Sequence, residues 1–138
     1  MDEKLTELKR RVEADDPSAL YEYSRLVRDS DPAEADKFVM LAAQLGEPHA
    51  AEQVGDVYLD RGDIPTAEQY FKLGAKAGIL DCSVKLAVIE LDRDEQAAVK
   101  ELEDLAEIGI RSAADALAEY YRVNGNKKQA AYWRSLVK

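Results

Sequence analysis

Hydrophobic and small side chains recur along this chain with a period of 31 or 32 residues. A small residue marks the start of each period, at Ala19, Ala50, Cys82 and Ala113. A bulky residue and then a small one follow four and five positions later, as Tyr23 and Ser24, Val54 and Gly55, Leu86 and Ala87, and Leu117 and Ala118. A period of this length is typical of stacked helical hairpins, because each two-helix unit buries its apolar face against its neighbours.

A second set of positions marks the other helix of each hairpin. These positions are an alanine, a large residue three places later and a small residue near the helix end: Ala35, Ala67, Ala98 and Ala130; Phe38, Tyr70 and Trp133; and Ala43, Ala75 and Ala106. Glu101 alone interrupts the aromatic series. Closely packed helices need small side chains where the backbones approach and large ones beside them. The pattern therefore predicts helix pairs.

The chain shows no sustained period-two alternation and is rich in good helix formers, so we expect an all-α protein. Proline falls in predicted first turns, where its missing N–H is tolerated, and Asp31 is an expected N-cap. Asn124 and Gly125 are expected to form the last turn between helices. The predicted helices span 2–14, 17–29, 32–45, 48–60, 64–77, 80–91, 94–108, 112–123 and 127–137.

The stretch LAAQLGEPHAAEQVGDVY at 41–58, completed by GDIPTAEQYFKLGAKAG at 62–78, resembles the tetratricopeptide-repeat superfamily and, within it, the Sel-one-like repeats. The resemblance covers 17–138. It is weakest in the third unit, where Glu90 stands in place of Tyr58 and Tyr121. It implies a right-handed α-solenoid of about four helix-turn-helix repeats preceded by one N-terminal helix. We expect one domain over 1–138, with a capping helix at 1–15 and repeats at 16–46, 47–78, 79–109 and 110–138.

The resemblance also implies a non-catalytic module that holds a partner protein or peptide in a concave groove lined by the first helix of each repeat. These positions lie opposite the packing positions, on faces that should be solvated. Val84 and Val88 are apolar exceptions: they could form a pocket for a hydrophobic anchor, or be buried against a neighbouring helix. The expected groove residues are Tyr21, Arg25, Arg28, His49, Glu52, Asp56, Val84, Val88, Leu91, Asp115, Glu119 and Arg122.

Charge is distributed unevenly along the chain, whose net charge is −9. The third repeat has three basic and nine acidic residues, whereas 110–138 has six basic and two acidic residues. An acidic surface repels phosphates, so we expect no direct nucleic-acid binding. It could attract a basic protein, or it could simply be a solvated surface that favours solubility. The candidate acidic surface consists of Glu101, Glu103, Asp104 and Glu107.

Other motifs give no indication of catalysis. Cys82, the only cysteine, occupies a packing position, and His49, the only histidine, has no catalytic or metal-ligand constellation around it. Arg61, Gly62 and Asp63 spell an adhesion tripeptide but fall in a predicted turn between helices. With no glycine-rich phosphate loop either, we expect no enzyme activity, no metal and no cofactor.

The two ends of the chain suggest location and assembly. The opening MDEKLTELKRR has no apolar core and no segment is long enough to span a bilayer, so we expect a cytoplasmic protein without membrane contact. An apolar stripe near the end should pack mostly against Leu117 and Tyr121. An apolar stripe at an end of the helix stack could also pair with a second copy of the chain and form a homodimer. The stripe consists of Ala130, Trp133, Leu136 and Val137.

Two function classes follow from these observations. The first is an interaction module whose groove binds a protein segment. The second is an acidic inhibitor or decoy that blocks a basic nucleic-acid-binding site on a partner. Steep loss of binding with salt would favour the second class, because it depends on exposed charges.

Overall fold

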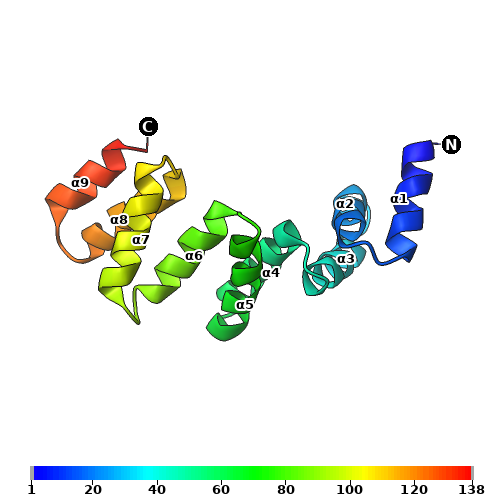
Figure 1. Cartoon of the computed structure of the whole chain (residues 1–138), viewed down its shortest axis with the longest axis horizontal. Coiled ribbons are helices and arrows are strands. Elements are labelled where there is room, and N and C mark those ends of the chain that lie inside the picture. Colours follow the sequence, from blue (N-terminus) through cyan, green and yellow to red (C-terminus); the bar gives the residue numbers. More distant parts are fainter. Residues whose placement is uncertain (1, 138) are drawn as a thin grey trace. The chain divides into compact units, whose positions relative to one another are not determined.

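A computed structural model describes residues 2–137, and these residues form nine α-helices without strands (Figure 1). The all-α helix-turn-helix fold predicted from the sequence is confirmed, and every helix limit lies within two residues of its expected position. The helices are α1 (Glu3–Glu13), α2 (Pro17–Val27), α3 (Pro32–Gln44), α4 (Pro48–Asp60), α5 (Ile64–Lys76), α6 (Leu80–Glu90), α7 (Glu95–Glu107), α8 (Arg111–Val123) and α9 (Lys127–Ser135).

The helices are grouped in two compact units, one ending at Gly78 and the other beginning at Ile79. The first unit holds α1–α5 and the second holds α6–α9. The border falls between the second and third predicted repeats.

Polar side chains cap the second helix of every hairpin. The predicted cap Asp31 accepts a hydrogen bond from the backbone N–H of Glu34, at 3.1 Å, and so occupies one of the donors that a helix start leaves unpaired. Asp63 caps α5 in the same way through Thr66 N–H, so the aspartate of the adhesion-like tripeptide has a structural role. The equivalent caps of α7 and α9 are Asp94 and Asn126.

A left-handed residue ends each repeating segment. Gly46, Gly78 and Gly109 have φ angles of 94°, 93° and 99°. Asp15 lies one period before Gly46 and has a φ of 57°, the only positive value at a non-glycine position among the described residues. The N–H of Asp16 bonds to Arg11 C=O, just as Glu47 N–H bonds to Ala42 C=O. The helix α1, predicted as a capping helix, therefore ends in the same way as the second helix of a hairpin.

The α4–α5 hairpin packs a glycine against an aromatic ring. Gly55 lies so close to Phe71 that a Cβ atom at this glycine would be 2.6 Å from Phe71 Cε1. The sequence pattern chose Tyr70 as the large residue here, but Phe71 is fully buried whereas Tyr70 is half-buried and stacks on Tyr58, with ring centroids 5.9 Å apart. In α3, α5 and α7 the innermost position therefore lies one residue beyond the predicted aromatic series, at Val39, Phe71 and Leu102. In α9 the predicted residue Trp133 is itself buried.

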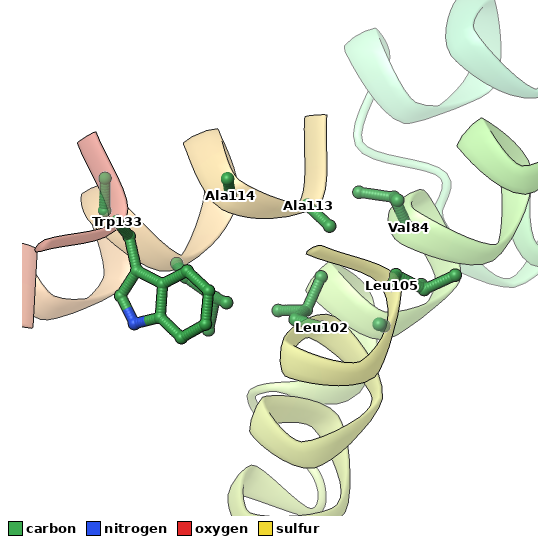
Figure 2. Close-up of a cluster of buried hydrophobic side chains, with 9 residues drawn as sticks. Val84, Leu102, Leu105, Ala113, Ala114 and Trp133 are labelled. Atoms are coloured by element: carbon green, nitrogen blue, oxygen red, sulfur yellow. The ribbon is translucent and has the colours of Figure 1, made fainter. Parts of the chain in front are cut away.

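The second unit has its own apolar core (Figure 2). Trp133 from α9 points toward Leu102 of α7, beside Ala113 and Ala114 at the start of α8. Leu117 belongs to the same cluster, and Tyr121 and Val137 pack against it. The cluster confirms the expected packing of Trp133, whose side chain is 4% exposed.

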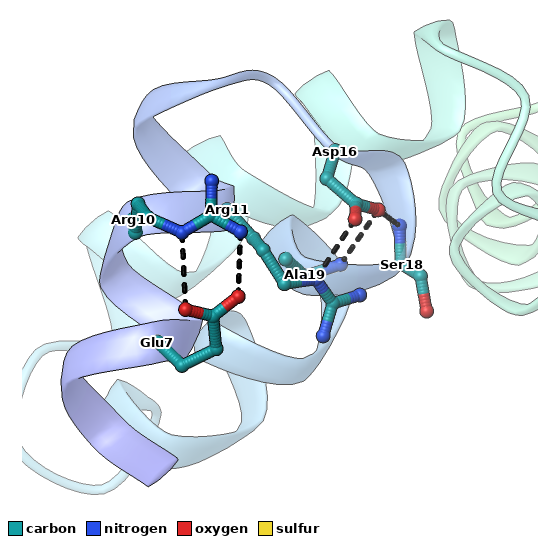
Figure 3. Close-up of polar contacts among 6 residues, drawn as sticks. All are labelled: Glu7, Arg10, Arg11, Asp16, Ser18 and Ala19. Carbon is teal, nitrogen blue, oxygen red and sulfur yellow. Dashed lines mark hydrogen bonds and ion pairs between the residues drawn. The ribbon is translucent and has the colours of Figure 1, made fainter. Parts of the chain in front are cut away.

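An ion pair fixes the junction between α1 and α2 (Figure 3). Asp16 caps α2 by accepting hydrogen bonds from the N–H groups of Ser18 and Ala19, and its other oxygen is 2.9 Å from Arg11 Nε. The Arg11 hydrogen bond holds the pKa of Asp16 below its usual 3.8, although partial burial opposes the shift. One carboxylate thus joins the end of the first helix to the start of the second.

Candidate partner-binding surfaces

In the first unit, the structure brings together groove residues predicted from α2 and α4. The rings of Tyr21 and His49 stack with centroids 6.3 Å apart and an interplanar angle of 22°. Arg25 is exposed on α2, and Glu52 and Asp56 are half-buried on α4. Aromatic rings next to both charge signs provide a surface suited to a polypeptide, which offers apolar, cationic and anionic groups together.

Arg28 does not join this group. It follows the end of α2, and its Nη1 donates to Asp36 Oδ1 of α3 at 3.0 Å. Its Nη2 is buried without a hydrogen-bond partner among the described residues. The side chain therefore turns toward the second helix of its own hairpin, because Asp36 supplies a charge there.

In the second unit, the predicted apolar pair is divided between core and surface. Val84 is 4% exposed and lies in the cluster with Leu102 and Leu105, so burial against neighbouring helices is the interpretation that holds for it (Figure 2). Val88 is 42% exposed, one turn further along α6. Leu91 packs against the cluster. The two valines consequently form no shared surface pocket.

The polar residues predicted on α8 are all exposed. Arg122 donates two hydrogen bonds to Glu119, from Nε at 2.9 Å and from Nη2 at 2.5 Å. These bonds lower the pKa of Glu119. Asp115 lies one turn before Glu119 on this helix. Across the hairpins, Ser112 of α8 donates to Asp81 of α6 at 2.7 Å, which aligns the first helices of this unit.

The candidate acidic surface lies along α7. Glu101, Asp104 and Glu107 are exposed and Glu103 is half-buried. Lys100 Nζ lies 3.3 Å from Asp104, one helical turn away. Burial raises the pKa of Tyr121, and the negative charge of Glu103 adds to that shift. Glu103 therefore lies near Tyr121 and is partly covered, whereas the other three acids are exposed.

Sequence reasoning missed a depression between α3 and α4 in the first unit. It has a volume of about 160 Å³ and is lined by Asp36, Val39, Met40, Gln53, Val54, Val57 and Arg61. Val57 is 41% exposed, and Arg61 lies 5.8 Å from the centre of the Tyr58 ring. The repeat pattern gave no signal for it, because the hollow depends on how two successive hairpins meet.

Some kinds of site are absent from the described part of the chain. Residues 2–137 contain no group of three or more histidine, cysteine or acidic side chains that could hold a metal ion. Within the same residues, no helix is long and apolar enough to cross a membrane.

Comparison with known proteins agrees with the repeat architecture. No protein-family model matches the sequence. No curated protein matches it either. Among solved structures, a Sel1 repeat protein from Oxalobacter formigenes matches 94% of this chain with a TM-score of 0.62 and 25% sequence identity. The chain has the Sel1-like repeat fold. It spans 61% of the length of that neighbour.

The Sel1-like fold confirms the resemblance inferred from 41–78. Folds of this kind are typically non-catalytic. The fold does not by itself identify the binding surface, which must be argued from the side chains.

Proposed function

We propose that this chain is a non-catalytic interaction module that binds a segment of a partner protein through its first helices. In the first unit the binding surface is formed by Tyr21, Arg25, His49, Glu52 and Asp56. In the second unit it is formed by Val88, Asp115, Glu119 and Arg122.

The stacking of Tyr21 on His49 carries this proposal. This contact joins a side chain of α2 to one of α4, which supports a binding surface shared by the first helices of two repeats. Tyr21 is half-buried, so its ring is already held by the core before a partner arrives. A fixed ring loses little conformational freedom on binding, which favours affinity.

Affinity capture from the native cell, followed by titration calorimetry with the purified partner, tests the proposal. Arg25→Glu with His49→Ala changes the surface without touching a buried side chain, and we expect binding to weaken at least about tenfold. Lys37→Glu with Gln69→Ala is the matched control, because it makes the same charge change on exposed positions of α3 and α5. Equal affinity of both double variants for the partner would rule out the α2–α4 surface.

A second candidate function is the acidic decoy that blocks a basic nucleic-acid-binding site. The exposure of Glu101, Asp104 and Glu107 on α7 supports it. We expect a decoy to lose affinity steeply as salt rises, and to lose it when Glu101, Glu103, Asp104 and Glu107 are changed to lysine. A surface anchored on the aromatic pair of α2 and α4 should respond weakly to both changes.

A further inference from the structure

The α6–α7 hairpin contains a hollow that the proposed function does not use. Its volume is about 340 Å³. Most of its lining residues have small side chains, and its two acidic members are Glu90, which is half-buried, and Glu101, which is exposed. The lining residues are Ser83, Leu86, Ala87, Glu90, Ala97, Ala98 and Glu101.

The repeat pattern explains why this hairpin is open. The residues equivalent to Glu90 and Glu101 are Tyr58 and Tyr70 in the α4–α5 hairpin, where the two rings are stacked at an interplanar angle of 3°. In the last hairpin the equivalents are Tyr121 and Trp133: Trp133 belongs to the core cluster and Tyr121 packs against it.

The first hairpin has a ring at one of the two positions, Phe38, and Val27 at the other. The centroids of Phe38, the equivalent of Glu101, and Tyr23 lie 5.2 Å apart. The third repeat has carboxylates at two positions where the second and fourth repeats have rings and the first repeat has one ring. A carboxylate side chain fills less space than an aromatic ring, and the hollow lies at these positions, with Ala87 and Ala98 at 5% and 2% exposed. The change of residue type at these positions is therefore accompanied by a hollow in the surface of the α6–α7 hairpin.

The chemistry of the hollow favours a long cationic side chain. Leu86, which is half-buried, and Ala97, which is exposed, offer apolar surface to the hollow, and the two carboxylates also line it. Arg93 is 3.9 Å from Glu90, at the outer limit of an ion pair, and Glu101 makes no ion pair within residues 2–137. An arginine side chain combines an aliphatic stem that can cover alanine with a planar fork that can bond two carboxylates.

We propose that the α6–α7 hollow receives an arginine side chain of a partner polypeptide. The net charge of −6 over residues 79–109, from three basic and nine acidic residues, would draw a basic segment toward it. The hollow and the proposed first-helix surface share no side chain, so an experiment can disprove one proposal without disproving the other.

A titration followed by NMR tests the proposal on the full chain. The probe is a neutral-capped pentapeptide with one central arginine between glycine and serine residues, compared with the same peptide carrying citrulline, lysine or phenylalanine. We expect the arginine peptide to shift the backbone amides of Ala87, Ala97 and Ala98, with a dissociation constant on the order of 1 mM because one side chain anchors it. Citrulline should give no binding, and lysine should bind more weakly than arginine.

Three double variants separate insertion into the hollow from general attraction to acidic groups. Glu90→Gln with Glu101→Gln should weaken binding of the arginine peptide about tenfold or more. Glu103→Gln with Asp104→Asn removes the same charge from α7 outside the hollow, and should weaken it less than about threefold. Glu90→Tyr with Glu101→Tyr restores the ring pair of the α4–α5 hairpin and should abolish the shifts in a chain whose amide spectrum stays dispersed.

The proposal would be overturned by equal losses in the two charge-removing variants, by equal binding of the phenylalanine peptide, or by the absence of shifts at the three alanines. Arg25→Glu with His49→Ala should leave binding of the arginine peptide unchanged, because those residues lie on α2 and α4. Loss of partner binding in that variant alone would concern the first-helix surface and not the hollow.

Discussion

Gly55 and Phe71 show at the scale of single residues how side-chain size determines the packing of a hairpin. The fully buried Phe71 ring occupies the space that a side chain at Gly55 would need. The small member of this contact could be predicted from the sequence, since Gly55 stands where Ser24, Ala87 and Ala118 stand in the other repeats. The large member could not, because Tyr70 and Phe71 are adjacent, both contact α4, and only the rotation of α5 decides which one meets Gly55.

Gly55→Ala should destabilise the protein by about 1–2 kcal/mol. The new methyl group would overlap a ring that the core holds in place, at a cost of about 1–3 kcal/mol, whereas the better helix propensity of alanine returns up to about 1 kcal/mol. Urea unfolding measures the difference. Combining Gly55→Ala with Phe71→Leu should cost less than the sum of the single changes, because the smaller side chain removes the overlap. A variant as stable as the parent protein would contradict the contact.

Asp15→Gly should stabilise the protein by about 0.5–1 kcal/mol. Asp15 holds a left-handed conformation that glycine adopts without strain and that is occupied by glycine in the following three repeats. Thermal unfolding followed by circular dichroism checks the gain. Asp29→Gly is the control: Asp29 has no positive φ, so the added backbone freedom should lower the melting temperature.

At the scale of helices, the sequence predicted where elements begin and end because the signals are local. Proline in a first turn, an aspartate before a helix and a glycine after it act over a few residues. The N-caps of α6 and α8 show the limit of such signals: Ile79 and Ile110 provide no side-chain bond, yet both helices form. Their starts are held by tertiary packing of Cys82 and Ala113, which are fully buried.

The junction of α1 and α2 should make stability depend on pH at the acidic end. Because the pKa of Asp16 is lower in the folded protein than its ordinary 3.8, its stabilising contribution is complete above that value and disappears as pH falls through the lowered pKa. The melting temperature of the parent protein should therefore exceed that of Asp16→Asn near neutral pH, and the difference should shrink in strong acid. In an Arg11→Gln background this difference should be smaller at neutral pH, since the ion pair is already gone. A difference that does not change with pH would contradict this role of the carboxylate.

At the scale of the whole molecule, the sequence predicted a repeating architecture and the structure confirms it. Two features could not be predicted from the sequence: the burial of Val84 and the α6–α7 hollow. The burial of Val84 depends on the angle at which α6 meets α7 and α8, which the spacing of residues does not encode. The α6–α7 hollow left a visible sign, since Glu90 and Glu101 break the aromatic series. Only the structure shows that this substitution opens a space rather than rearranging the helices around it.

The sequence is compatible with a homodimer formed through an end of the helix stack. Substitutions at exposed residues in and just after α9 test this prediction. Tyr132 and Leu136 are 53% and 51% exposed there, while Ala130 and Trp133 are buried. We predict that a dimer detected by sedimentation at high concentration uses these side chains, so Leu136→Asp should shift it to monomer. Ile108→Asp, at an exposed position after α7, should not. A parent protein that sediments as a monomer at every concentration would dispose of the dimer.

The complete burial of the Cys82 thiol at the start of α6 has a practical consequence. A maleimide or another alkylating reagent can reach this sulfur only when the packing around α6 opens, so the rate of labelling measures how often that opening occurs. With no other cysteine in the chain, the signal needs no engineered probe. We expect labelling of the native protein to be far slower than labelling in denaturant, and a substitution such as Trp133→Leu to accelerate it. Fast labelling of the native protein would show that the packing around Cys82 opens far more often than its complete burial indicates.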